Sequence, residues 1–234
     1  MPAALDTAVA EALAAARRRI AEAGVTPATV RVVAVTKGFG PEAVLAARRA
    51  GLDDVGENYA QELLGKVRAL AGEAGPAPAP GAGPAVRWHF LGAVQRNKVP
   101  QLAPVVWCWQ GLSRLAEGEA IARRHPGAAV LVEVELTGVP GRNGCAPGDV
   151  PALVEGLQRL ELDVRGLMTV ASQDPEGAQA AFRAVRRLAD DLGLPERSMG
   201  MSDDYPLAVR EGATMVRLGR ALFGDRPPRR VTGS

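Results

Sequence analysis

The stretch Arg31-Val-Val-Ala-Val-Thr-Lys37-Gly-Phe-Gly40 decides the fold. Residues 32–36 are mostly β-branched and apolar, which predicts a strand that is buried on both faces. Two glycines then open a loop, and Pro41 suits the first turn of a helix because its φ angle is fixed. A buried strand followed by a helix is typical of the parallel sheet of an α/β fold. Lys37 therefore stands at the carboxyl end of such a strand, where α/β proteins bind their ligands.

Lys37 is one of only three lysines, with Lys66 and Lys98, among 28 lysine and arginine residues. A lysine at a strand end of an arginine-rich chain suggests chemistry that a guanidinium cannot perform, such as bonding to an aldehyde. Desolvation in the mouth of the fold would lower the pKa of its amine and make that amine a nucleophile. The alternative is a solvated strand-end lysine, because most lysines are surface residues.

The composition is that of a globular chain and disfavours several classes of function. A length of 234 residues is enough to bury the core of one α/β domain. A formal net charge of +2, dispersed basic residues and few aromatic side chains give no indication of nucleic-acid binding. We expect no membrane span and no signal peptide. Cys108 and Cys145 are expected to be thiols of a cytoplasmic protein.

Strand and helix patterns alternate along the chain. An amphipathic helix is expected at 6–23, and eight strands follow, each succeeded by a helix. The strands are expected at residues 32–36, 53–55, 86–91, 105–109, 129–136, 162–168, 198–201 and 214–218. Eight such units predict a closed (β/α)₈ TIM barrel with an extra N-terminal helix. An open doubly wound sheet is the rival, and the lack of a Gly-x-Gly-x-x-Gly motif after an early strand disfavours it.

The whole chain, 1–234, is expected to form one domain. Residues 1–24 are assigned to the N-terminal helix. Residues 72–85 are rich in alanine, proline and glycine and predict a flexible surface loop. Residues 226–234 predict a frayed tail.

Polar and glycine residues gather just after the predicted strand ends. The loops after strands seven and eight of a barrel often hold phosphate, and here they are 200–202 and 217–219. Their glycines let an anion approach the backbone, and the N–H groups of a following helix can point at it. Ser202 could equally cap that helix. Asp203 and Asp204 would repel an anion unless, as we expect, they face away from it.

A lysine after the first strand, opposite a phosphate cradle after the last two, fits pyridoxal 5'-phosphate (PLP). The aldehyde would form an imine with Lys37, and the phosphate would lie at Ser202 and Gly219. Arg217 would face the ring nitrogen. The alternative for Arg217 is an ion pair with a carboxylate at a neighbouring strand end.

Six motifs in order make the chain resemble the YggS/PROSC family of PLP homeostasis proteins. They are A-V-T-K at 34–37, G-E-N-Y-A-Q-E at 56–62, W-H-F-L-G-A-V-Q-R-N-K at 88–98, R-G-L-M-T at 165–169, S-M-G-M-S-D-D at 198–204 and A-T-M-V-R-L-G-R-A-L-F-G at 213–224. The resemblance covers residues 30–224 and implies a barrel like the N-terminal domain of alanine racemase.

The resemblance also implies that PLP is held as an internal aldimine, a Schiff base, on Lys37. It implies further cofactor-binding residues at Asn58, Met201, Ser202, Arg217 and Gly219, and supporting residues at Thr36, His89, Gly200 and Arg220. Three positions depart from the family's pattern. Thr36 replaces a common serine, and Arg142 stands in a loop that often carries a lysine. Arg220 replaces a small hydroxyl residue and either contacts the phosphate or turns outward.

Imine formation alone does not make an enzyme. A racemase needs a second acid/base on the other face of the ring, which the alanine racemases take from a tyrosine of a second domain. No second domain is expected here, and the only tyrosines are Tyr59 and Tyr205. We therefore expect a non-catalytic protein that holds PLP and takes part in intracellular vitamin B6 homeostasis. A weak PLP-dependent amino-acid racemase is the alternative, and a protein that keeps PLP as a structural group is a third possibility.

The expected partners are PLP and the apo-forms of PLP-dependent enzymes, with no nucleic acid, membrane or metal. Residues 95–98 form a polar rim that either contacts a recipient enzyme or is a solvated helix face. Strand alternation directs His89 to the barrel interior or to the helix layer. The resemblance favours a monomer.

Overall fold

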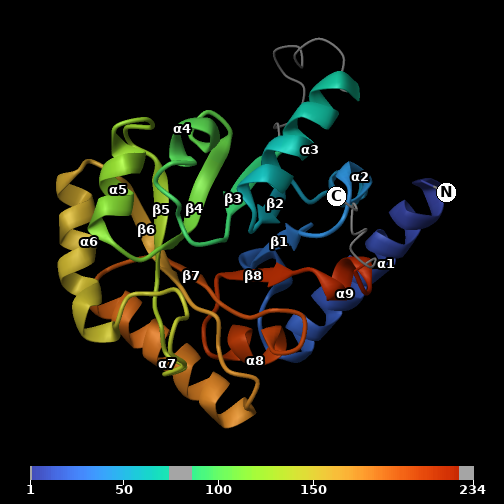
Figure 1. The fold of residues 1–234 in the computed structure, drawn as a ribbon. Coiled ribbons are helices and arrows are strands. Elements are labelled where there is room, and N and C mark those ends of the chain that lie inside the picture. Colours follow the sequence, from blue (N-terminus) through green and yellow to red (C-terminus); the bar gives the residue numbers. More distant parts are fainter. Residues whose placement is uncertain (1, 74–85, 227–234) are drawn as a thin grey trace.

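The strands of this protein close into a barrel. The computed structural model describes residues 2–73 and 86–226. In it β1 (Arg31–Val35) pairs in parallel with both β2 (Asp54–Glu57) and β8 (Met215–Leu218), so the sheet has no free edge. Helices surround the strands (Figure 1). The predicted (β/α)₈ barrel is confirmed, and the open-sheet rival is excluded.

The remaining strands follow around the barrel in chain order. They are β3 (Arg87–Phe90), β4 (Val106–Leu112), β5 (Ala129–Glu133), β6 (Asp163–Met168) and β7 (Glu196–Ser198). All neighbouring pairs run parallel. Parallel strands place their carboxyl ends at the same rim, so every loop that leaves a strand toward a helix starts there.

Most helices begin with a proline in the first turn, which the missing N–H and fixed φ angle of proline favour. Their bounds are α1 (Pro2–Glu22), α2 (Pro41–Arg49), α3 (Ala60–Glu73), α4 (Val99–Leu102), α5 (Leu115–Ala122), α6 (Val150–Arg159), α7 (Pro175–Asp191), α8 (Tyr205–Arg210) and α9 (Arg220–Phe223). Short 3₁₀ turns occupy Pro27–Thr29 and Pro147–Asp149. Among the helices within 2–73 and 86–226, none is long and apolar enough to cross a bilayer.

The extra helix α1 packs on the outside of the barrel. Its buried stripe of Val9, Leu13, Ala16 and Ile20 is the one that the sequence periodicity predicts. It contacts α2, α8 and α9, and Figure 1 shows it running beside α9. It therefore covers the helices at the point where the first and last units of the barrel meet.

The barrel interior is different at its two ends. A small apolar cluster of Cys108, Ala129, Leu131 and Met168 fills its middle. At the amino-terminal end of the strands, guanidinium groups of Arg31, Arg87 and Arg165 lie 5.6, 5.7 and 4.9 Å from the ring centre of Trp107. Cation–π contacts thus close this end, which in barrels serves stability. The pocket described below opens at the other end.

Strand seven begins and ends earlier than the sequence pattern predicts. It covers 196–198 instead of 198–201, because Gly200 has a φ of +90° that no strand accommodates. A Cβ at Gly200 would lie 2.5 Å from the Cβ of Ala208. Only glycine fits this turn. Of the predicted loop 72–85, the first two residues end α3, and 74–85 lie outside the described residues, as does most of the predicted tail.

Replacement of Gly166 should test the packing of strand β6 on β7. A Cβ on Gly166 would lie 1.9 Å from the carbonyl oxygen of Glu196, which is backbone and cannot turn aside. We expect Gly166→Ala to lower the free energy of unfolding by about 1–3 kcal/mol. Gly65→Ala is the matched control, because a Cβ there meets nothing within 4 Å on helix α3. It should raise the free energy of unfolding by about 0.5–1 kcal/mol. Urea unfolding measures both, and a Gly166→Ala protein as stable as wild type would contradict the packing.

Candidate functional site

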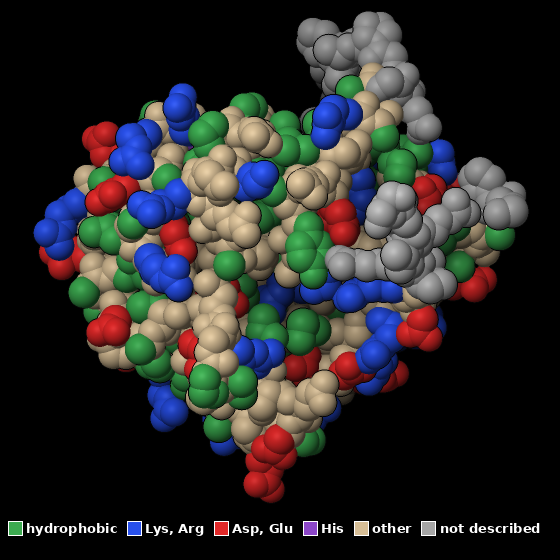
Figure 2. All heavy atoms as spheres, in the orientation of Figure 1, with side chains coloured by type: hydrophobic (Ala, Val, Ile, Leu, Met, Phe, Trp, Pro, Cys, Tyr) green, Lys and Arg blue, Asp and Glu red, His purple; other side chains and the backbone are tan. Residues whose placement is uncertain are grey.

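A cavity of about 220 Å³ opens at the carboxyl-terminal end of the barrel. Lys and Arg side chains gather in the hollow of this face, over β8 and toward α9 (Figure 2). Apolar walls come from Val35, Leu91, Met168 and Val170. The predicted site residues that line the cavity are Lys37, Asn58, Met201, Ser202, Arg217, Gly219 and Arg220.

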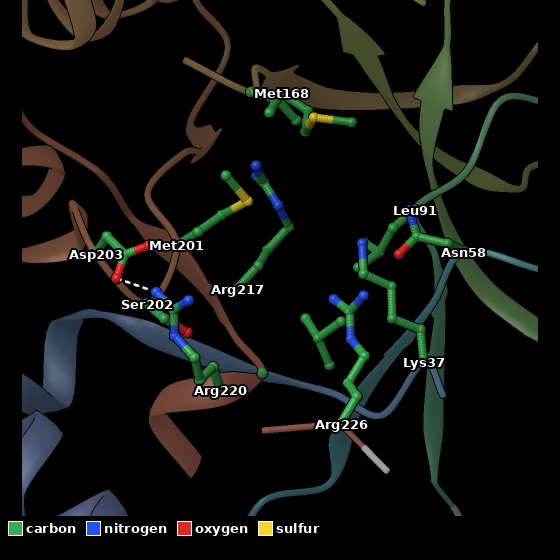
Figure 3. Close-up of a pocket in the computed structure, with 13 residues that line it drawn as sticks. Lys37, Asn58, Leu91, Met168, Met201, Ser202, Asp203, Arg217, Arg220 and Arg226 are labelled. Carbon is green, nitrogen blue, oxygen red and sulfur yellow. Dashed lines mark hydrogen bonds and ion pairs between the residues drawn. The ribbon is translucent and has the colours of Figure 1, made fainter. Parts of the chain in front are cut away.

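Barrel closure explains why residues so far apart in sequence meet here. Val33 of β1 is the register partner of Arg217 on β8, and Lys37 follows that strand by two residues. Figure 3 shows Lys37 and Asn58 on one side of the cavity, Ser202 on the opposite side, and Arg217 between them.

The Lys37 amine is tuned toward its neutral form. Its side chain is half-buried, and this burial lowers the pKa of Lys37 below the usual 10.5. The positive charges of Arg226 and Arg217 lower it further, while the carboxylates of Glu57 and Glu62 raise it. Lys37 is half-buried and lines the cavity, so it is not a fully solvated strand-end lysine, and its amine can act as a nucleophile once it is deprotonated.

Helix α3 holds the chain on both sides of Lys37. Lys66 Nζ donates to the carbonyl oxygen of Thr36 at 2.6 Å and also forms an ion pair with Glu57. The amide N–H of Gly38 donates to Glu62 Oε2 at 2.8 Å. Thr36 itself is fully buried and donates its hydroxyl to Glu57 at 2.7 Å. Thr36 therefore supports the site from below and does not line it.

Arg217 is almost completely buried but presents one end to the cavity. Its Nη1 donates to the carbonyl oxygen and hydroxyl of Ser198 at 2.7 and 2.8 Å, and its Nη2 donates to the carbonyl oxygen of Thr169 at 2.7 Å. Burial lowers the pKa of Arg217 to about 10, so the group stays a cation at neutral pH. Within the described residues, neutral oxygens and no carboxylate ion pair hold this guanidinium.

A hydrogen-bonded string crosses the barrel interior behind Arg217. The Ser198 hydroxyl donates to Gln110 Oε1 at 2.7 Å, and Gln110 Nε2 lies 2.7 Å from His89 Nδ1. His89 Nε2 lies 2.9 Å from Asp54 Oδ1. Burial lowers the pKa of His89, which is therefore neutral at pH 7. A neutral ring beside a carboxylate donates from Nε2 and accepts at Nδ1. His89 thus faces the barrel interior, and it is linked to Arg217 through the side chains of Gln110 and Ser198.

The opposite side of the cavity joins the loops after β7 and β8. Ser202 Oγ accepts the amide N–H of Ala221 at 3.0 Å, in the first turn of α9. The hydroxyl therefore caps the helix after strand eight and not its own helix, α8. Asp204 Oδ1 accepts the Met201 N–H at 2.6 Å. Gly200 shapes this loop by its positive φ and does not line the cavity.

The expectation that both aspartates face away is wrong for Asp203. Its carboxylate lines the cavity and is ion-paired with Arg220 (Figure 3). The Asp203 side chain is 80% exposed, so solvent as well as Arg220 accounts for its charge at the rim of the cavity. Arg220 therefore lines the cavity as the ion-pair partner of Asp203.

Sequence reasoning missed Arg226, which it placed in a frayed tail. The side chain lines the cavity beside Lys37 (Figure 3). A proline-rich arginine segment carries no pattern that indicates such a position. Two further residues that the sequence analysis weighed line other cavities: Arg142 lines a neighbouring one with Glu133, and Tyr59 lines another that shares Asn58.

Comparisons with known proteins agree with this geometry. The family model for the alanine racemase N-terminal domain matches residues 9–227. The pyridoxal phosphate homeostasis protein of Pseudomonas aeruginosa is 41% identical over 231 residues, which cover 93% of this chain and 96% of the relative. That of Deinococcus radiodurans is 40% identical over 219 residues, which cover 90% and 97%.

A solved structure gives the same result. PipY of Synechococcus elongatus PCC7942, solved with PLP bound, is 32% identical and superposes with a TM-score of 0.78. The match covers 92% of this chain and all of PipY. The chain therefore belongs to the alanine racemase N-terminal domain family and, within it, to the pyridoxal phosphate homeostasis proteins.

Proposed function

We propose that this protein binds PLP through a covalent bond between the cofactor's aldehyde and Lys37, and that it serves intracellular PLP homeostasis without turnover. The arrangement around Arg217 carries the proposal. An amine of lowered pKa lies on one side of the cavity, and a glycine-containing strand-to-helix turn lies on the other. Arg217 lies between them, where a pyridine ring nitrogen would need a donor. The solved structure of PipY, which holds PLP, supports the same assignment.

The residues present fit the cofactor. Asn58 Oδ1 is buried in the cavity wall and has no hydrogen-bond partner, so it is suited to a polar group of a ligand. Three hydrogen bonds account for three of the five N–H groups of Arg217, which leaves donors for a ring nitrogen. Ser202 and Gly219, beside the first amides of α9, would hold the phosphate. Met201, Leu91 and Val35 would contact the ring faces.

The same residues argue against efficient catalysis. Bound PLP supplies an aldehyde and a ring that withdraws electrons best when its nitrogen is protonated. Arg217, a fixed cation, would donate to that nitrogen and keep it unprotonated. Both tyrosines of the chain lie outside the cavity lining, and Asp203, the one carboxylate among the described lining residues, is held by Arg220. A second acid/base for racemisation is thus missing from this wall.

We further place this role in the cytoplasm, with a monomer that delivers PLP to apo-enzymes. The rim at 95–98 supports delivery, because Gln95 and Lys98 line the cavity that shares Asn58 with the PLP pocket. Native mass spectrometry would test the monomer.

Borohydride reduction after incubation with PLP tests the attachment residue. We expect a visible absorption band in the loaded protein and, after reduction and peptide mapping, the adduct on Lys37 alone. Lys37→Ala should lose both the band and the adduct, and Lys98→Ala should keep them. An adduct on Lys66 or Lys98 in wild type would refute the assignment, and so would a protein that takes up no PLP.

The rate of PLP attachment should depend on pH through Lys37. Only the neutral amine attacks an aldehyde, so the rate rises with pH and levels off above the pKa of the amine. Because that pKa is below 10.5, the midpoint should lie at lower pH than for a free lysine analogue. Arg226→Gln should move the midpoint upward, because it removes a positive charge that lowers the pKa. Stopped-flow absorbance from about pH 6 to about pH 10 measures both, and a midpoint equal to that of the analogue would contradict the tuning.

Amino-acid turnover separates the carrier from the enzyme. We expect holo protein incubated with L- or D-alanine to racemise it no faster than the same concentration of free PLP, as followed by chiral chromatography. Steady turnover that disappears in Lys37→Ala would replace the carrier with a racemase, while PLP binding itself would stand.

A further inference from the structure

We propose that helix α3 positions the Lys37 amine by holding the two peptide groups on either side of its Cα, through Lys66 and Glu62. The inference rests on the proposed function, since it assigns a role to residues around the attachment lysine. Lys66 and Glu62 are positioning residues: neither lines the cavity.

The geometry places one contact on each neighbouring peptide. The Thr36 carbonyl belongs to the peptide that precedes Lys37, and Lys66 Nζ bonds it at 2.6 Å. The Gly38 N–H belongs to the peptide that follows, and Glu62 bonds it at 2.8 Å. Residues 62 and 66 are four apart on one helix face. Because peptide groups are planar, fixing both of them fixes the backbone angles of Lys37 and hence the direction in which its Cα–Cβ bond leaves the backbone.

The identity of Lys66 favours this role. Its ammonium has three N–H donors, and three oxygens lie around it: Thr36 O, Thr36 Oγ1 at 3.3 Å, and the Glu57 carboxylate. A planar guanidinium directs its donors outward in a fork and could not place them around one point. In a chain with only three lysines, this requirement explains why position 66 is one of them.

Stability alone is a weak explanation for the buried pair of Lys66 and Glu57. Only 5% and 0% of the two side chains are exposed, and the desolvation of such a pair largely offsets its Coulomb attraction. Burial raises the pKa of Glu57, and its Oε2 atom has no hydrogen-bond partner. A pair with an unsatisfied oxygen adds little to folding. Lys66 of this pair contacts the peptide that precedes Lys37, which indicates that the pair orients Lys37.

The contacts of Lys66 and Glu62 with the two peptide groups form a clamp on Lys37. This clamp, with Glu57, also contributes charge to the site. Glu57 and Glu62 both raise the pKa of Lys37, against burial and the cations Arg226 and Arg217. Position and charge can be separated at Glu62, because glutamine keeps the acceptor for the Gly38 N–H and removes the negative charge.

The test measures the plateau rate of PLP attachment at high pH, where the amine is neutral in every variant. We expect Glu62→Ala to lower this rate about 10-fold, because small misplacements of a reacting group slow its reaction strongly. Glu62→Gln should keep the wild-type plateau rate but move the midpoint to lower pH. Arg68→Met, an exposed change on the same helix, should alter neither.

The double variant Glu57→Gln/Lys66→Met tests the buried contact of Lys66. It removes both charges and keeps the side-chain volumes nearly unchanged. We expect its urea midpoint to stay close to wild type while its plateau rate falls at least as far as that of Glu62→Ala. If the double variant does not fold, the comparison of Glu62→Ala with Glu62→Gln tests the positioning role alone.

The outcomes distinguish the two proposals. Wild-type protein that forms no adduct on Lys37 would end the proposed function and the clamp with it. Wild-type protein that does form this adduct, with Glu62→Ala and any folded double variant at the wild-type plateau rate, would end the clamp only. Equal losses in Glu62→Ala and Glu62→Gln at the plateau would also contradict it, because the hydrogen bond would then not matter.

Discussion

The pairing of β1 with β8 is the constraint on which the site depends. This ladder closes the barrel and sets Val33 beside Arg217, so that Lys37 from near the start of the chain and Gly219 from near its end line one cavity. The helix α1 packs across the same junction, against α2, α8 and α9. A sheet left open here would place Lys37 and Gly219 at opposite edges, and neither end could form a pocket alone.

Support for the cavity comes from buried polar groups on two sides. Below Lys37, α3 and the Glu57–Lys66 pair hold the β1 end. Behind Arg217, the string through Ser198, Gln110 and His89 reaches Asp54, whose ionised state is maintained against burial by hydrogen bonds from Arg87 and His89 that keep its pKa well below the usual range. Such networks are costly when incomplete, and they restrict the groups that they hold to one arrangement.

The order of the strands, the barrel and several of the residues that line the cavity could be predicted, because hydrophobic periodicity and strand-end position are local properties of the sequence. Lys37, Asn58 and Arg217 all follow that rule. Contacts between distant segments could not be predicted. Nothing local indicates that Ser202 caps α9, that Asp203 pairs with Arg220, or that Arg226 returns to the cavity. The seventh strand was misplaced because apolar residues continue past Ser198, while the positive φ of Gly200 ends the pairing.

The measurement that tests the central claim most directly is a crystal structure of this chain grown with PLP. The account predicts continuous density from Lys37 Nζ to the cofactor, with the phosphate against Ser202 and Gly219 and the ring nitrogen facing Arg217. Density for PLP elsewhere on the protein, or in this cavity with the phosphate at the Lys37 side, would contradict it.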